Sequence, residues 1–84
     1  MEVHLVLTPL QARAARKLLG WSQLDLAQRS GLTYDTIAHF ETGIGKPRRT
    51  TAAAIRTALE EAGVEMGKGA NPARLKPRDE LAGQ

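Results

Sequence analysis

Apolar residues between positions 8 and 62 recur at helical spacing, and glycines divide them into four segments. Glycine readily adopts the left-handed conformation that ends helices, and Thr or Ser readily caps their first turns. The pattern therefore predicts helices over residues 9–19, 23 to 29 or 30, and 34 to 41 or 42. A fourth helix is expected to begin at Thr50 or Thr51 and to stop at Gly63. The predicted caps of the first three are Thr8, Ser22 and Thr33.

The first predicted helix has two distinguishable sides. Leu10, Ala14, Leu18 and Trp21 recur near the helical period, so we expect them on the buried side. Ala15 and Leu19 lie beside them. The polar residues between them are expected to face solvent. They are Gln11, Arg13, Arg16 and Lys17.

The segments outside these helices favour short strands. Val3, Leu5 and Leu7 alternate with other residues, which indicates a strand, although a frayed terminus is the alternative. Residues 64–66 and 73–76 flank a turn rich in Gly, Asn and Pro and predict a small hairpin, to which residues 3–7 could add a third strand. A lone hairpin needs a surface to pack on. We thus divide the chain into an N-terminal extension or strand (1–7), a helical domain (8–66) and a C-terminal hairpin and tail (67–84).

Composition restricts the kind of protein. Its 84 residues suffice for one small domain, and the absence of cysteine excludes disulfides. No apolar run is long enough for a membrane span, and the start lacks the features of a secretory signal, so we expect a cytoplasmic protein. The two histidines, His4 and His39, lie in unrelated segments, and no nucleophile–base set, phosphate loop or metal cluster is visible. We therefore expect no enzymatic activity, no cofactor and no metal.

The net charge of +3 is unevenly distributed. Residues 8–49 hold seven Lys and Arg against three acids, whereas residues 50–66 hold one base against three acids. This asymmetry predicts a basic face for an anionic partner and a more acidic back. A merely solvated surface is the alternative.

Residues 23–42 place two short helices around a tight turn. Ala27, small enough for a close helix crossing, lies four residues before Gly31, and Ile37 lies six residues after it. This spacing resembles the helix-turn-helix of the phage repressor and Cro type, an XRE-like DNA-binding family. The similarity continues through residues 19–23, 40–43 and 53–64, and so covers about residues 8–66. It implies a mainly α, compact four-helix domain of the lambda-repressor type.

The resemblance also implies roles for individual residues. The third helix would enter the major groove of double-stranded DNA, and the loop after it would contact the sugar-phosphate backbone. Arg16 and Glu41 would form a structural ion pair that orients the third helix. The candidate base-reading residues are Tyr34, Asp35, Thr36 and His39. The candidate backbone contacts are Ser22, Gln23, Thr33, Lys46, Arg48 and Arg49.

Structural roles remain open for several of these residues. Tyr34 could lie on a neighbouring helix, Asp35 could serve the helix dipole, and Ser22 and Thr33 could act only as caps. The function implied is a small transcriptional regulator or repressor that binds a palindromic operator as a homodimer. The alternative is a protein-interaction module, such as an antitoxin or accessory regulator, that uses the same fold to bind a protein partner.

Overall fold

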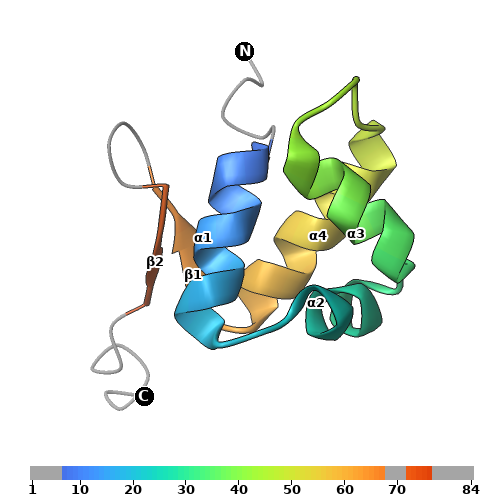
Figure 1. Ribbon diagram of the computed structural model, residues 1–84. Helices are drawn as coiled ribbons and strands as arrows, with labels where there is room; N and C mark the ends of the chain where they lie inside the picture. Colours follow the sequence, from blue (N-terminus) through green and yellow to red (C-terminus); the bar gives the residue numbers. More distant parts are fainter. Residues whose placement is uncertain (1–6, 68–71, 77–84) are drawn as a thin grey trace.

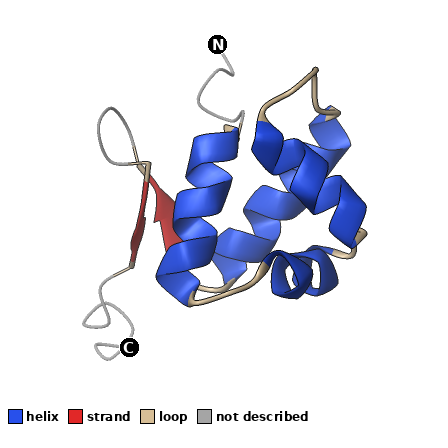
Figure 2. Ribbon diagram, in the orientation of Figure 1, coloured by secondary structure: helices blue, strands red, loops and turns tan. Residues whose placement is uncertain are grey.

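A computed structural model describes residues 7–67 and 72–76 of the chain. Within these residues, four helices are followed by a two-stranded antiparallel sheet, as predicted (Figures 1 and 2). Helix α1 lies between the strand pair and the other helices (Figure 1). The elements are α1 (Pro9–Leu19), α2 (Gln23–Ser30), α3 (Tyr34–Thr42), α4 (Arg49–Glu61), β1 (Val64–Met66) and β2 (Ala73–Leu75).

The first three helices have the predicted ends. The side-chain oxygens of Thr8, Ser22 and Thr33 each accept a hydrogen bond from the backbone N–H of the third helical residue. Gly31, between α2 and α3, has a φ of +76°, a conformation that side chains with a Cβ rarely adopt. Local sequence thus determines where these three helices begin and end.

Helix α4 begins at Arg49, one or two residues earlier than predicted. Arg48 occupies the cap position and makes no side-chain capping hydrogen bond, so a threonine hydroxyl does not start this helix. Ile55, further along α4, is fully buried in the core. Packing of an apolar face can determine where a helix starts without a strong cap. Arg49 consequently belongs to the first turn of α4 rather than to the preceding loop.

The hydrophobic core joins all four helices. Leu26 of α2, Ile37 of α3 and Ile55 of α4 are completely buried, as is Val64 of β1. Ala27 is also buried, where α2 packs against its neighbours. These contacts place the two helices of the helix-turn-helix on a common support, so that the outer face of α3 has a defined orientation.

The predicted buried face of α1 is confirmed only in part: Leu19 and Trp21 pack against the core, but the other two leucines of the helix do not. Leu10 and Leu18 are 57% and 44% exposed. Ala15 is fully buried as expected, and so is Ala12, which the pattern did not place on that side. Small alanine side chains allow close approach of the neighbouring elements. Arg16, predicted to face solvent, has a side chain only 13% exposed because it pairs with an acid of α3. Close packing and this ion pair together set the rotation of the helix.

The strands form the predicted hairpin, with Val64 opposite Leu75 and Met66 opposite Ala73. It packs against α1, and the Gln11 side chain donates to the Gly67 carbonyl at 3.3 Å. This packing supplies the support that a lone hairpin needs. Of the predicted third strand, residues 3–6 lie outside the described residues. Leu7 has no strand structure, and its side chain is buried in the core.

The cap of α2 predicts a pH-dependent contribution to stability. The Ser22 backbone N–H donates to Asp25 Oδ2 at 2.8 Å, and Ser22 Oγ accepts from the Asp25 backbone N–H at 3.0 Å. Hydrogen bonds with Ser22, and to a smaller extent the charge of Arg29, hold the pKa of Asp25 below its ordinary value of 3.8. Because the pKa of Asp25 is lower in the folded protein than in the unfolded chain, the ionised carboxylate stabilises the fold at pH values above the unfolded-state pKa. This stabilisation is lost as the pH falls through the folded-state pKa.

The melting temperature of the wild type should therefore exceed that of Asp25→Asn at about pH 6, and the difference should shrink toward about pH 2. Thermal unfolding followed by circular dichroism measures both values. A difference that stays constant over this range would contradict the assigned role of the Asp25 carboxylate.

Candidate nucleic-acid interface

Helix α3 has one buried face and one outward face. Ile37 and Phe40 are buried in the core, whereas Tyr34, Asp35 and His39 are exposed. Tyr34, whose alternative role was packing on a neighbouring helix, is 49% exposed. Ile37 and Phe40 are three residues apart and share the buried side of the helix. Asp35 and His39 are four residues apart and share the outward side. Three of the four candidate base-reading residues are thus available to a ligand.

Thr36, the fourth candidate, is half-buried and takes part in the cap of α3. Its backbone N–H donates to Thr33 Oγ1 at 3.1 Å, and the two hydroxyls lie 2.9 Å apart. Thr33 is therefore a helix cap in the described structure. Each hydroxyl still has hydrogen-bonding capacity for a second partner, since a hydroxyl both donates and accepts.

An open hollow of about 480 Å³ separates α3 from the start of α4. It brings three of the candidate base-reading residues together with two of the three loop cations. Tyr34 and Arg49 do not line it, although both are exposed. The lining residues are Asp35, Thr36, His39, Phe40, Lys46, Pro47, Arg48 and Thr51.

Thr51 is a lining residue that was not predicted from the sequence. It lies in the first turn of α4, where its pattern indicated only a helix start. Its position beside the hollow follows from the packing of α4 against the helix-turn-helix. No signal in the sequence distinguishes it from Thr50.

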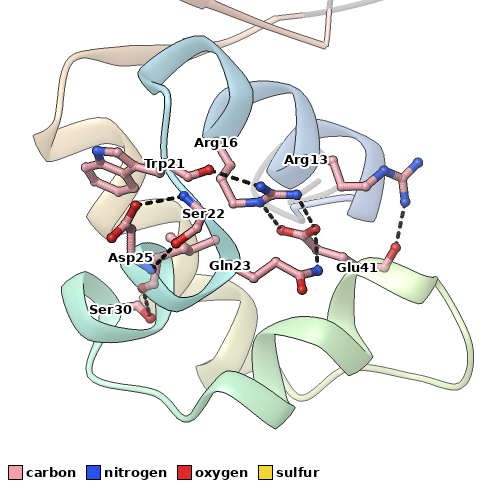
Figure 3. Close-up of polar contacts among 9 residues, drawn as sticks. Arg13, Arg16, Trp21, Ser22, Gln23, Asp25, Ser30 and Glu41 are labelled. Atoms are coloured by element: carbon pink, nitrogen blue, oxygen red, sulfur yellow. Dashed lines mark hydrogen bonds and ion pairs between the residues drawn. The ribbon is translucent and has the colours of Figure 1, made fainter.

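Arg16 and Glu41 form the expected ion pair beneath the interface (Figure 3). The Arg16 guanidinium donates to both carboxylate oxygens, from Nε to Oε2 and from Nη2 to Oε1, each at 2.9 Å. Its Nη1 also donates to the Trp21 carbonyl at 3.0 Å. Glu41 is only 3% exposed. Two parallel hydrogen bonds constrain both position and angle, so this pair joins α1 firmly to the end of α3.

Two further side chains bind Glu41 in contacts that the sequence did not predict. Arg13 Nη1 donates to the Glu41 backbone carbonyl at 2.6 Å, which places a cation at the C-terminal end of α3, where the helix dipole favours it. Gln23 Nε2 donates to Glu41 Oε1 at 3.1 Å. The partners are 28 and 18 residues apart, and no local pattern in the sequence indicates either contact.

Trp21 lies between α1 and α2 and packs against the core as a partly buried side chain. The guanidinium carbon of Arg29 lies 4.9 Å from the centroid of its ring, within the range of a cation–π contact. The ring thus supports α2 rather than adding to the outward face of α3.

The described part of the chain contains no group of three or more His, Cys, Asp and Glu side chains placed to hold a metal ion. Among the described helices, none has the length and apolar character to cross a membrane.

Comparison with known proteins identifies the family. A family model described as helix-turn-helix matches residues 13–64, which is more than half of the chain. The matched residues include α2, the turn at Gly31, α3 and α4. A search of curated proteins gives no match. The chain belongs to the helix-turn-helix family of the phage repressor and Cro type, a family of DNA-binding regulators.

Proposed function

We propose that the protein is a transcriptional regulator that recognises a specific sequence in double-stranded DNA. Helix α3 would enter the major groove, with base edges read by Tyr34, Asp35, Thr36 and His39. The observation that carries this proposal is the shared hollow, where Asp35 and His39 face Lys46 and Arg48. Groups able to read bases and cations able to bind phosphate therefore meet on one side of the molecule.

The remaining backbone contacts are proposed at helix starts. Ser22 and Gln23 lie at the start of α2, Thr33 caps α3, and Arg49 lies in the first turn of α4. Backbone N–H groups at such ends attract phosphate oxygens, and capping is compatible with that contact. These residues would set the register of the protein on the duplex, whereas α3 would select the sequence.

A selection experiment tests the proposal. Duplexes retained by the protein from a random pool should share a motif, and their affinity should fall steeply as salt increases, because phosphate contacts release counterions. A retained pool without a common motif would contradict sequence specificity. Affinity that does not depend on salt would contradict DNA binding through the cations.

The residues on α3 should control sequence preference. Asp35→Ala and His39→Ala are each expected to reduce discrimination at one or two base pairs by about 1–3 kcal/mol, because each removes a contact with a base edge. Asp35 can accept from cytosine N4, and His39 can donate to guanine. Affinities for single-base variants of the selected duplex measure the effect. An equal loss on all sequences would contradict base reading.

The proposed regulator acts as a homodimer on a palindromic operator. A single α3 spans only a few base pairs, and two copies related by twofold symmetry would contact half-sites about 34 Å apart. Light scattering of the complex with the selected duplex gives the stoichiometry. One copy per duplex at micromolar concentration would contradict the dimer.

A further inference from the structure

One buried carboxylate joins helices α1, α2 and α3. Glu41, near the end of α3, accepts from Arg16 of α1 and from Gln23, the first residue of α2. Arg13 of α1 binds its main-chain carbonyl. Figure 3 shows Gln23 and Arg16 converging on the Glu41 carboxylate from different helices. The position of the Gln23 side chain thus depends on the group that also sets the position of α3.

The chemistry of the carboxylate determines which way the Gln23 amide faces. An ionised carboxylate only accepts hydrogen bonds, so the nitrogen of the amide, not its oxygen, must lie toward Glu41. The nitrogen carries two hydrogens, and the 3.1 Å bond to Glu41 Oε1 uses one. Within the described residues, the second N–H has no hydrogen-bond partner. Without Glu41, rotation of the amide could present its oxygen, which repels a phosphate.

We infer that Glu41 is a positioning residue for DNA binding: it holds the Gln23 amide so that the second N–H donates to a phosphate of the duplex. The inference rests on the proposed function and deepens it. Glu41 itself does not touch DNA in this arrangement.

The first test compares two glutamines of α2. Gln23→Leu removes the amide and keeps most of the side-chain volume, and Gln28→Leu is the matched control, since Gln28 is exposed and has no hydrogen-bonded side chain. Binding of the duplex selected above is measured by fluorescence anisotropy over a series of salt concentrations. Gln23→Leu should bind about tenfold more weakly, the loss expected for a hydrogen bond to a charged group. Gln28→Leu should bind like the wild type.

The salt dependence separates this role from a general structural defect. Gln23 is neutral and releases no counterion, so the slope of log affinity against log salt should not change in Gln23→Leu. Misplacement of the basic loop would instead reduce the slope. Unchanged affinity, or a reduced slope, would overturn the inference.

The second test asks whether Glu41 acts through Gln23. In Glu41→Gln, the side chain at position 41 can donate as well as accept, so it no longer enforces one orientation of the Gln23 amide. This change should weaken DNA binding about threefold to tenfold when Gln23 is present. In the Gln23→Leu background, the same change should alter affinity less than about twofold, because the two residues share one interaction. Equal effects in both backgrounds would contradict the positioning role.

A measurement on the wild type covers the case in which Glu41→Gln does not fold. The side-chain amide signals of Gln23 are followed by nuclear magnetic resonance while the selected duplex is added. The Gln23 amide protons should shift and those of Gln28 should not. Wild-type binding with an unmoved Gln23 signal overturns the inference alone, whereas failure to obtain any bound duplex contradicts the proposed function.

Discussion

Arg16→Ala is expected to lower the free energy of unfolding by about 3–5 kcal/mol, because it leaves a buried carboxylate without its ionic partner. Glu41 is 3% exposed, and Arg16 supplies two of the three hydrogen bonds to its carboxylate oxygens. The change also removes the bond to the Trp21 carbonyl. Urea denaturation followed by circular dichroism measures the loss. A loss below about 1 kcal/mol would place the pair among exposed ion pairs and contradict its structural role.

Two further variants test whether the loss of stability comes from leaving one charge of a buried ion pair without its partner. Arg74→Ala breaks the Arg74–Glu65 pair of the hairpin, whose side chains are 63% and 40% exposed, and should cost less than about 1 kcal/mol. Replacing both members of the buried pair, as in Arg16→Met with Glu41→Leu, should recover most of the stability lost in Arg16→Ala. DNA binding should not recover in that double variant, because the Gln23 contact with Glu41 is still missing.

The double change Lys46→Ala and Arg48→Ala should weaken DNA binding about 60-fold at about 0.1 M salt, equally on all sequences. Each phosphate contact contributes a slope of about 0.9 to the dependence of log affinity on log salt, so losing two should reduce the slope by about 1.8. The structure motivates this pair because both residues line the hollow beside α3. Anisotropy titrations on selected and unrelated duplexes test both numbers.

The matched control removes the same charge from the other side of the molecule. Arg74→Ala with Lys76→Ala changes two exposed cations of the hairpin, which lies on the side of α1 away from α3 (Figure 1). This control should leave the salt slope nearly unchanged. If the two double variants behave alike, net charge rather than a localised surface governs binding, and the proposed interface is wrong.

Local features of the chain were sufficient to predict most of the fold. The caps at Thr8, Ser22 and Thr33, and the glycines after three helices, act over a few residues, so the ends of these helices could be read directly. The hairpin was predicted from the same kind of local pattern. The start of α4 was the exception, since no side-chain cap determines it.

The buried face of α1 could not be predicted in the same way. The helical period placed Leu10 and Leu18 on the buried side together with Ala15, yet the two leucines are exposed and Ala12 is buried with Ala15. The outcome depends on how closely the neighbouring elements approach α1. The periodicity of apolar residues gives no information about that distance.

The order of short-range signals along the chain was therefore enough to specify the four helices, the hairpin and the family. Tertiary packing alone decided that Gln23 and Arg13 meet Glu41 and that Thr51 joins the residues around the hollow. It also decided that α1 buries Ala12 and leaves Leu10 and Leu18 exposed. The physical reason is the separation along the chain over which each kind of interaction acts. Caps and turns depend on neighbours three or four residues away, whereas a shared carboxylate or a hollow depends on how separate helices lie against one another.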